Sequence, residues 1–333
     1  MKAEVYYLVS PYQLEFIEEE IAPIGRLDIF CETEFTAISP GTELSAYIGL
    51  PPLRPGSVYP RLQGYCNVAT VIEVGQSVVG VKPGDRVLTT NSHRSHFLTV
   101  EREIQLILRK DDNPKEFVLS YLFHLGYNAI LRSNLSLGSN VLVIGLGVLG
   151  LASIAMAKQS GSTVIGISDN EKPTEIAFQY GAHDVLTRKL SENVLEIFGN
   201  KLADVVIVTT NSWTDWEIAL KSVGKLGVIA CLGFPGRGEN SCPFNPLDSQ
   251  YFYDKQIKIE AVGFSPEFPD DRGFARFNEK DNLEFIGKIL RSKSVDASLI
   301  NSGTYNSENL EQAYKDLLVR KNSPITYLLK WKN

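Results

Sequence analysis

The sequence contains only four cysteines in 333 residues, and they stand far apart along the chain, at Cys31, Cys66, Cys231 and Cys242. No two of them form a CxxC pair, and the segment Met1–Ser10 contains no apolar core of a secretory signal. We therefore expect no disulfide framework, and a reducing, cytoplasmic location.

The sequence also lacks an excess of positively charged residues. The 33 Lys and Arg residues are scattered and stand against 39 Asp and Glu, which gives a net charge of -6. This composition lacks the basic stripe expected of a nucleic-acid-binding protein. The one long uncharged run, Val141–Ala157, is short for a membrane span and is interrupted by Gly145, Gly147 and Gly150. We expect neither a nucleic-acid nor a membrane partner, and we interpret the run as a buried strand leading into a buried helix.

The first third of the chain is typical of short strands separated by turns that contain Gly and Pro, such as Ser39–Gly41 and Lys82–Asp85. The strands expected there are Val5–Leu8, Leu27–Glu32, Cys66–Glu73, Arg86–Thr89 and Phe97–Val100. This pattern predicts a small, mostly antiparallel barrel.

The pattern changes near Asn113–Pro114, where helices begin to alternate with apolar strands. The expected strands are Val141–Ile144, Thr163–Ile167, His183–Leu186, Asp204–Val208, Gly227–Leu232 and Ile257–Gly263, and the chain ends in a strand at Thr326–Trp331. Continuous apolar strands that alternate with helices predict a parallel sheet covered on both faces, and therefore an α/β fold with a doubly wound sheet beside the barrel.

The clearest motif is Gly145-Leu146-Gly147-Val148-Leu149-Gly150, which follows an apolar strand and opens a helix. In this context Gly145 permits the tight turn, Gly147 lets the backbone approach a pyrophosphate, and Gly150 lets the helix pack closely on the strand. The phosphates then lie at the helix N-terminus, where free N–H groups favour anions. The motif predicts a dinucleotide cofactor; the alternative is a turn that needs small residues for packing alone.

The residue after the second strand distinguishes NADP from NAD. Ser168 ends that strand, leaves room for a 2'-phosphate and can donate a hydrogen bond to it, with Lys172 and Arg188 as basic partners. Asp169 follows one position later, and a carboxylate that reaches the adenosine ribose would favour NAD. We expect NADP, with NAD as the alternative.

As an ordered set, several segments resemble the medium-chain dehydrogenase/reductase superfamily over nearly the whole chain. They are Ile38–Leu44, Gly64–Cys66, Val81–Val87, the glycine motif, Asp204–Ile207 and Leu226–Val228. A looser similarity, in Ile38–Glu43, Tyr59–Tyr65 and Leu328–Lys332, is to the branch that contains bacteriochlorophyllide a dehydrogenase.

The resemblance implies a GroES-like β-barrel catalytic domain at 1–118, completed by 266–333, and a Rossmann domain at 119–265, with the active site in the cleft between them. It also implies nicotinamide-side contacts at Thr209, Thr210 and Gly233-Phe234-Pro235, and a homodimer formed through edge strands around Tyr251–Val262.

The same resemblance implies that no zinc is bound. Zinc-containing members place Cys, His and an acidic residue or Cys where this chain has Pro40, Tyr65 and Tyr121. The four-cysteine structural zinc lobe has no counterpart between Arg86 and Arg109. His93 and His96 lack a nearby third ligand, so we expect no metal there either.

Without zinc, hydrogen-bond donors must polarise a carbonyl group. The candidates are Tyr65 and Tyr121, which replace ligands; Thr42, which matches the family's proton-relay hydroxyl; Glu43, a supporting carboxylate; and His124, a possible route for protons to solvent. Each tyrosine and His124 has a purely structural alternative, namely packing in the interior.

Taken together, these residues predict a zinc-independent, NAD(P)-dependent oxidoreductase that transfers hydride between the nicotinamide and a carbonyl/alcohol pair of a small organic molecule. One alternative is reduction of an activated C=C bond, as in quinone and enoyl reductases. The other is a dinucleotide-binding protein without catalysis.

Overall fold

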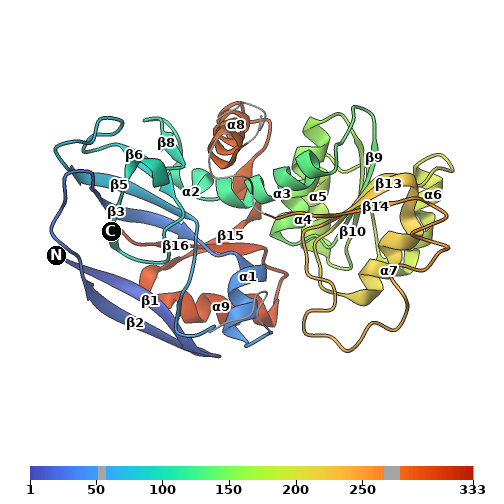
Figure 1. The fold of residues 1–333 in the computed structure, drawn as a ribbon, viewed down its shortest axis with the longest axis horizontal. Coiled ribbons are helices and arrows are strands. Elements are labelled where there is room, and N and C mark those ends of the chain that lie inside the picture. The colour runs from blue at the N-terminus through green and yellow to red at the C-terminus, as the bar shows by residue number, and fades with distance from the viewer. Residues whose placement is uncertain (52–57, 264, 266–277, 333) are drawn as a thin grey trace. The chain divides into compact units, whose positions relative to one another are not determined.

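The computed structural model describes residues 1–51, 58–263, 265 and 278–332 (Figure 1). The chain forms two compact units: residues 1–121 with 267–333, and residues 122–266. The domain boundary predicted at 265/266 lies at the edge of a stretch outside the described residues.

The first unit contains two sheets. The larger has the strand order β15-β16-β3-β5-β6-β8, with β7 also paired to β3, and all of these pairs are antiparallel except β15 with β16. The smaller has the order β2-β1-β4. The bounds are β1 Lys2–Ser10, β2 Gln13–Glu20, β3 Ile29–Ala37, β4 Arg61–Leu62, β5 Asn67–Val74, β6 Arg86–Thr89, β7 His96–Thr99, β8 Leu106–Leu108, β15 Asn301–Asn306 and β16 Thr326–Lys330.

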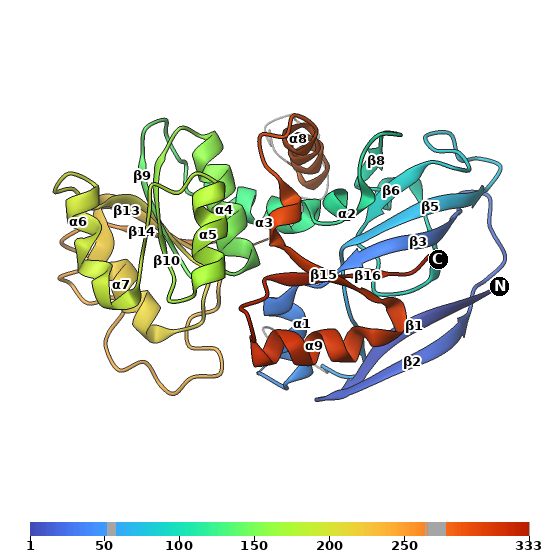
Figure 2. The same cartoon turned by 180° about the vertical axis from the view of Figure 1, so that it is seen from behind.

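Alternation along the strands places one apolar face of the larger sheet in a core. Ile29 and Cys31 of β3 lie two residues apart, as do Ala69 and Val71 of β5, and all four are buried in one cluster. In the described part of this unit, the sheets are accompanied by the helices α1 Pro40–Tyr47, α2 Pro114–Phe117, α8 Glu279–Arg291 and α9 Leu310–Val319. Seen from either side, α9 lies along α1, and the two share a buried cluster that includes Tyr47 (Figures 1 and 2).

Ser39–Gly41, which we expected to be a turn, is instead the start of α1. Ser39 has the extended backbone of an N-cap residue, and Pro40 occupies the first helical position. Proline fits this position because the first N–H groups of a helix have no intrahelical partner. The sequence signal was therefore a helix start rather than a turn.

The second unit is built on a six-stranded parallel sheet with the order β11-β10-β9-β12-β13-β14. In chain order this is 3-2-1-4-5-6, the doubly wound arrangement in which the strand order reverses beside the first strand. The strands are β9 Asn140–Ile144, β10 Thr163–Ile167, β11 Asp184–Leu186, β12 Ala203–Val208, β13 Val223–Cys231 and β14 Lys258–Ala261. The helices are α3 Ser120–Arg132, which begins at the end of the first unit, α4 Val148–Gln159, α5 Glu171–Gln179, α6 Val194–Ile197 and α7 Trp213–Ser222.

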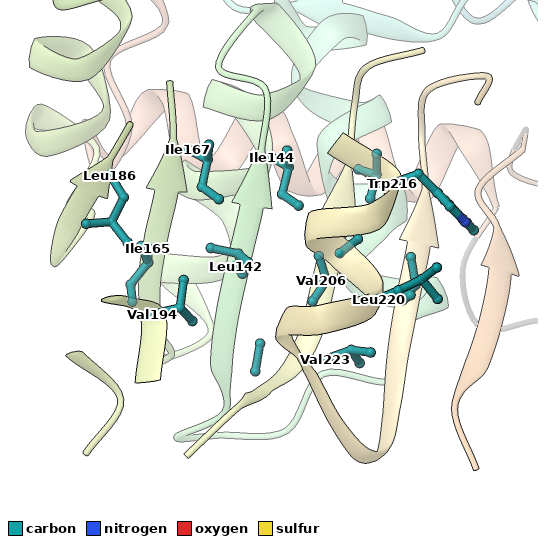
Figure 3. Close-up of a cluster of buried hydrophobic side chains, with 14 of the residues drawn as sticks. Leu142, Ile144, Ile165, Ile167, Leu186, Val194, Val206, Trp216, Leu220 and Val223 are labelled. Carbon is teal, nitrogen blue, oxygen red and sulfur yellow. The ribbon is translucent and has the colours of Figure 1, made fainter. Parts of the chain in front are cut away.

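One face of this sheet is covered by α7. Leu142 and Ile144 of β9 project to the same side, as successive odd or even positions of a strand do, and they meet Trp216 and Leu220, which lie one turn apart on α7 (Figure 3). The expected strand and helix within Val141–Ala157 are β9 and α4. Within the described ranges, no helix is both long and apolar enough to traverse a bilayer.

The packing of α3 on α4 depends on a glycine. A Cβ atom on Gly126 would lie 2.7 Å from Cβ of Ala152 and 2.8 Å from its carbonyl carbon. Since one of these contacts is with backbone, a larger side chain there must push the two helices apart.

We predict that Gly126→Ala lowers the free energy of unfolding by about 1–3 kcal/mol through overpacking, although alanine is the better helix former. Urea denaturation measures the change. The matched control is Gly41→Ala in α1, where an added Cβ meets no atom within 4 Å. The control should be neutral or stabilising by up to about 1 kcal/mol. Equal stability of Gly126→Ala and wild type would contradict the packing described here.

Candidate active site

The glycine motif forms the turn between β9 and α4. Gly145 has a φ of +88° and donates its N–H to the carbonyl of Ile167 on β10, at 3.1 Å. A Cβ on Gly145 would lie 2.3 Å from Cγ2 of Thr210, and a Cβ on Gly150 would lie 1.9 Å from the carbonyl oxygen of Gly145. A larger residue at Gly145 would meet the Thr210 side chain in a strained backbone conformation, and one at Gly150 would meet backbone, as the sequence motif predicts.

Gly147 differs from its two neighbours in the motif, because a Cβ there would meet no atom within 4 Å. This residue is exposed and is the N-cap of α4, whose first turn is Val148, Leu149 and Gly150. The N–H groups of a first helical turn have no intrahelical acceptor. The turn therefore leaves open space beside a set of backbone donors, which fits the pyrophosphate of a dinucleotide.

The loops after β12 and β13 pack against this turn. Thr209 donates its hydroxyl proton to the carbonyl of Gly145, at 2.7 Å. A Cβ on Gly233 would lie 2.2 Å from the carbonyl oxygen of Thr210, so the two loops touch through backbone. Phe234 is 45% exposed and donates its N–H to Oδ1 of Asn211, and Pro235 follows it. The structure thus brings Thr209, Thr210 and Gly233 together with the glycine motif at the carboxyl edge of the sheet.

Of the residues predicted for the adenosine side, Ser168 and Asp169 follow the end of β10, and Arg188 follows β11. Ser168 is buried, and its hydroxyl oxygen accepts the N–H of Asn170 at 3.1 Å. The Asp169 carboxylate is half-exposed and accepts the backbone N–H of Arg188 at 3.0 Å and its Nη1 at 2.5 Å. The backbone hydrogen bond and then the guanidinium hold the pKa of Asp169 below its usual value. Lys172 is partly buried near the start of α5.

Asp215 is a residue of this region that the sequence analysis missed. Its carboxylate is fully buried and accepts Nε of Arg188 at 2.6 Å, Nη2 of Arg188 at 2.9 Å and the Thr210 hydroxyl at 2.7 Å. In the sequence, an acidic residue in the first turn of a helix is an ordinary feature, because it complements the helix dipole. Only its hydrogen bonds with Arg188 and Thr210 distinguish Asp215 from such an ordinary residue.

In the first unit, Tyr65 and Tyr121 lie against each other, edge to face, with ring centroids 5.5 Å apart. The Tyr65 hydroxyl donates to Oγ of Ser39, and the Tyr121 hydroxyl donates to Oε2 of Glu279 at 3.1 Å. Burial raises the pKa of both phenols, and the Glu279 charge raises that of Tyr121 further. Thr42, on α1, also hydrogen-bonds to Tyr65. Three of the predicted catalytic residues are therefore associated with one another, and both phenols stay protonated.

Glu43 is a buried carboxylate at the centre of a hydrogen-bond network. It accepts the N–H of Ser39 at 2.6 Å, Nε2 of His93 at 2.8 Å and the hydroxyl of Tyr314 at 2.5 Å. Nδ1 of His93 lies 2.8 Å from the Thr36 hydroxyl. His93 and Tyr314 are partners that the sequence analysis did not predict. Glu43 thus holds Ser39, the residue that accepts the Tyr65 hydrogen bond, in place.

The residues at the family's zinc positions do not fit a zinc site. Pro40 offers no ligand atom, and the hydroxyls of Tyr65 and Tyr121 are protonated and engaged in other hydrogen bonds. The neighbouring Cys66 is buried, and burial raises the pKa of its thiol. In the part of the chain that the structure describes, no three His, Cys, Asp or Glu residues are grouped so as to hold a metal ion.

His124 is fully buried in α3. Its Nε2 lies 3.0 Å from Oγ of Ser265, and Ser265 in turn donates to Oδ1 of Asn128 at 2.7 Å. The Ser265 oxygen therefore accepts the Nε2 proton of a neutral imidazole. Burial lowers the pKa of His124 to about 4. The ring has no exposed surface, and the passage of protons through His124 to solvent stays a prediction.

The chain is similar in sequence to known dehydrogenases. Residues 148–271 match the family described as zinc-binding dehydrogenase. An NADP-dependent isopropanol dehydrogenase from Clostridium beijerinckii is 27% identical over 53% of this chain and 61% of its own length. An NADP-dependent isopropanol dehydrogenase from Entamoeba histolytica is 23% identical over 94% of this chain and 90% of its own length. A quinone oxidoreductase from Lama guanicoe is 30% identical over 59% of this chain and 60% of its own length.

Solved structures share the fold over the whole chain. An oxidoreductase/dehydrogenase of unknown specificity from Escherichia coli has a TM-score of 0.83 at 18% identity, with 100% of both chains covered. The 2R,3R-butanediol dehydrogenase from Bacillus subtilis has a TM-score of 0.82 at 16% identity, with 99% of this chain and 100% of its own covered. These neighbours confirm the predicted fold class, a Rossmann domain with a GroES-like β-barrel domain. The sequence relatives, two of which are named as NADP-dependent dehydrogenases, support a nicotinamide-dependent oxidoreductase.

Proposed function

We propose that this protein is a zinc-independent dehydrogenase that interconverts a carbonyl and an alcohol on a small organic molecule with NADP(H), or alternatively NAD(H). The observation that carries the proposal is the combination of an open glycine turn at Gly147 with two protonated phenols where zinc-containing relatives have ligands. Bound at the turn, the nicotinamide cofactor supplies or accepts the hydride.

The cofactor would be held by residues of the second unit. The N–H groups of the first turn, from Gly147 to Gly150, have no intrahelical acceptor and would bind the pyrophosphate. Ser168, Asp169, Lys172 and Arg188 would contact the adenosine side. Thr209, Thr210 and the Gly233–Pro235 loop, which pack on the same turn, would contact the nicotinamide side.

The proton would be handled by residues of the first unit. Tyr65 carries a phenolic proton that it donates to Ser39, and the same proton can be donated to a substrate oxygen on which negative charge develops. Thr42, beside Tyr65, would relay that proton. Tyr121 packs on Tyr65 and donates a hydrogen bond to Glu279, so we assign it to positioning the Tyr65 ring.

Reduction of an activated C=C bond is the second candidate. The observation that favours it is the similarity to quinone oxidoreductases, one of them 30% identical. The looser resemblance to the bacteriochlorophyllide a dehydrogenase branch is why we rank carbonyl/alcohol chemistry first. Turnover of enones without turnover of ketones or alcohols would reverse this ranking.

We further propose a cytoplasmic homodimer formed through the edge of the parallel sheet. The support is that β14 is the last strand in the order of that sheet, next to β13 alone among the described strands. An edge strand of this kind offers unpaired backbone groups to a second copy.

Replacement of Gly147 tests the proposed binding site for the pyrophosphate. Gly147→Val should fold as wild type does, because its backbone is extended and the added side chain meets open space. The affinities for NADPH and NADH should both fall at least about tenfold, since the side chain fills the space proposed for the pyrophosphate. Tryptophan fluorescence titration gives the affinities, and thermal denaturation the stability. Gly150→Ala is the contrasting variant and should lose stability instead. Unchanged cofactor affinity in Gly147→Val would refute the proposed binding site.

Replacement of Tyr65 tests the proposed proton donor. Tyr65→Phe should lower kcat for ketone reduction by about 100-fold or more, the usual contribution of a general acid, with little change in NADPH affinity. Tyr121→Phe is the matched control, because it removes the hydroxyl that donates to Glu279, and its kcat should fall less than about tenfold. Steady-state kinetics on a panel of ketones measures both. A Tyr65→Phe enzyme with wild-type kcat would exclude Tyr65 as the donor.

The protonation of His124 makes the stability of the protein depend on pH. The native state keeps this imidazole neutral down to a pKa of about 4, whereas the free side chain protonates near 6.5. Between these values the unfolded state binds the extra proton, so stability falls as the pH is lowered from about 6.5 to about 4, by on the order of 3 kcal/mol.

In His124→Gln this loss of stability with falling pH should be smaller, since glutamine keeps an N–H donor for Ser265 but does not titrate. His96→Gln, at a half-exposed histidine, should retain the wild-type slope. Urea denaturation across this pH range compares the three proteins. Parallel stability profiles for wild type and His124→Gln would show that His124 is not the group responsible.

A further inference from the structure

Arg188 is held by two carboxylates that differ in exposure. Asp215 is fully buried, whereas the Asp169 side chain is 49% exposed. The Arg188 side chain is one third exposed, at 33%. One side of Arg188 therefore faces the interior of the unit, and the other faces solvent at the end of β10.

The two carboxylates bind different edges of the guanidinium. Asp215 accepts from Nε and Nη2 in a bidentate pair, at 2.6 and 2.9 Å, and Asp169 accepts from Nη1 at 2.5 Å. A bidentate pair fixes the plane and direction of the guanidinium as well as its position. Of its five N–H donors, the described residues engage three, so the outer edge retains donors for another acceptor.

Asp215 is itself fixed from three sides. It lies in the first turn of α7, where the helix dipole stabilises a negative charge, and the next residue, Trp216, is anchored in the hydrophobic core of the unit. It also accepts the hydroxyl of Thr210, whose backbone packs on Gly233. Asp215 thus joins the loop that carries Arg188 to the loop that packs on the glycine turn.

Charge at this position is unbalanced. Asp169 and Asp215 carry two negative charges and Arg188 one positive charge, which leaves a net charge of about -1 on the three side chains. The exposed Asp169 carboxylate holds one N–H of the edge of Arg188 that an incoming anion would use. Two oxygens of a tetrahedral phosphate group can accept from this edge bidentately, as the two oxygens of a carboxylate do.

We propose that Asp215 is a positioning residue for the cofactor: it aims the outer edge of Arg188 at the 2'-phosphate of NADP(H), and Asp169 occupies that edge until the phosphate displaces it. This inference rests on the proposed function. It makes the preference between NADP and NAD depend on a residue that does not itself contact the phosphate. It also gives the two aspartates opposite effects on that preference.

The test is a titration of the full-length protein and its variants with NADPH and with NADH. Asp215→Asn should weaken NADPH binding at least about tenfold and leave NADH binding within about threefold, because Arg188 loses its charged anchor. Asp169→Asn should do the reverse: NADPH binds at least about threefold more tightly and NADH more weakly, since the competing charge and the ribose acceptor are both lost. The control is Asp254→Asn, an exposed aspartate in the same unit that should change neither affinity.

Should Asp215→Asn not fold, Arg188→Lys provides the same test, because lysine keeps the charge but cannot bind Asp215 in the bidentate mode. It should lose NADPH affinity at least about fivefold without loss of NADH affinity. Equal weakening of both cofactors in Asp215→Asn or Arg188→Lys would show a merely structural role and overturn the inference, as would unchanged affinities. A wild-type protein that binds NADH but not NADPH would also overturn it, while leaving the proposed dehydrogenase intact. Binding of neither cofactor would instead refute the proposed function.

Discussion

The close approach of backbone to backbone around the first strand of the parallel sheet is the constraint on which the cofactor site depends. An added Cβ on Gly150 would lie 1.9 Å from the Gly145 carbonyl oxygen, and one on Gly233 would lie 2.2 Å from that of Thr210. Side chains at these positions would separate β9 from α4 and the β12 loop from the β13 loop. Because glycine permits the contact, the first-turn N–H groups of α4 and the loops after β12 and β13 converge on one place, and Gly147 is left facing open space.

In each unit a fully buried carboxylate organises the polar residues around it. Glu43 accepts hydrogen bonds from Ser39, His93 and Tyr314, and Asp215 accepts from Arg188 and Thr210. Burying a charge is costly unless such partners compensate it, so the partners cannot move independently of the carboxylate. In the first unit this fixes the acceptor of the Tyr65 proton, and in the second it fixes the direction of Arg188.

Much of the fold could be predicted from the sequence, because it depends on local patterns. The strands Arg86–Thr89 and Thr163–Ile167 have the bounds that the apolar runs predict, and α4 ends before Gly161, which has a φ of +72°. The strand β2 was not predicted, because its side chains are mostly exposed and three consecutive glutamates, Glu18–Glu20, mask its periodicity. The helix α1 was mistaken for a turn because Pro and Gly occur in helix starts as well as in turns.

By itself the sequence determined the change from short strands to strands that alternate with helices, the glycine motif, and the absence of zinc-ligand residue types at Pro40, Tyr65 and Tyr121. Only the tertiary structure decided which partners the polar residues have. Glu43 pairs with His93 and Tyr314, 50 and 271 positions away, and Arg188 pairs with Asp215, 27 positions away. The physical reason is that helices, strands and tight turns follow from the conformational preferences of neighbouring residues, whereas a buried charge finds its partners only when distant elements pack together.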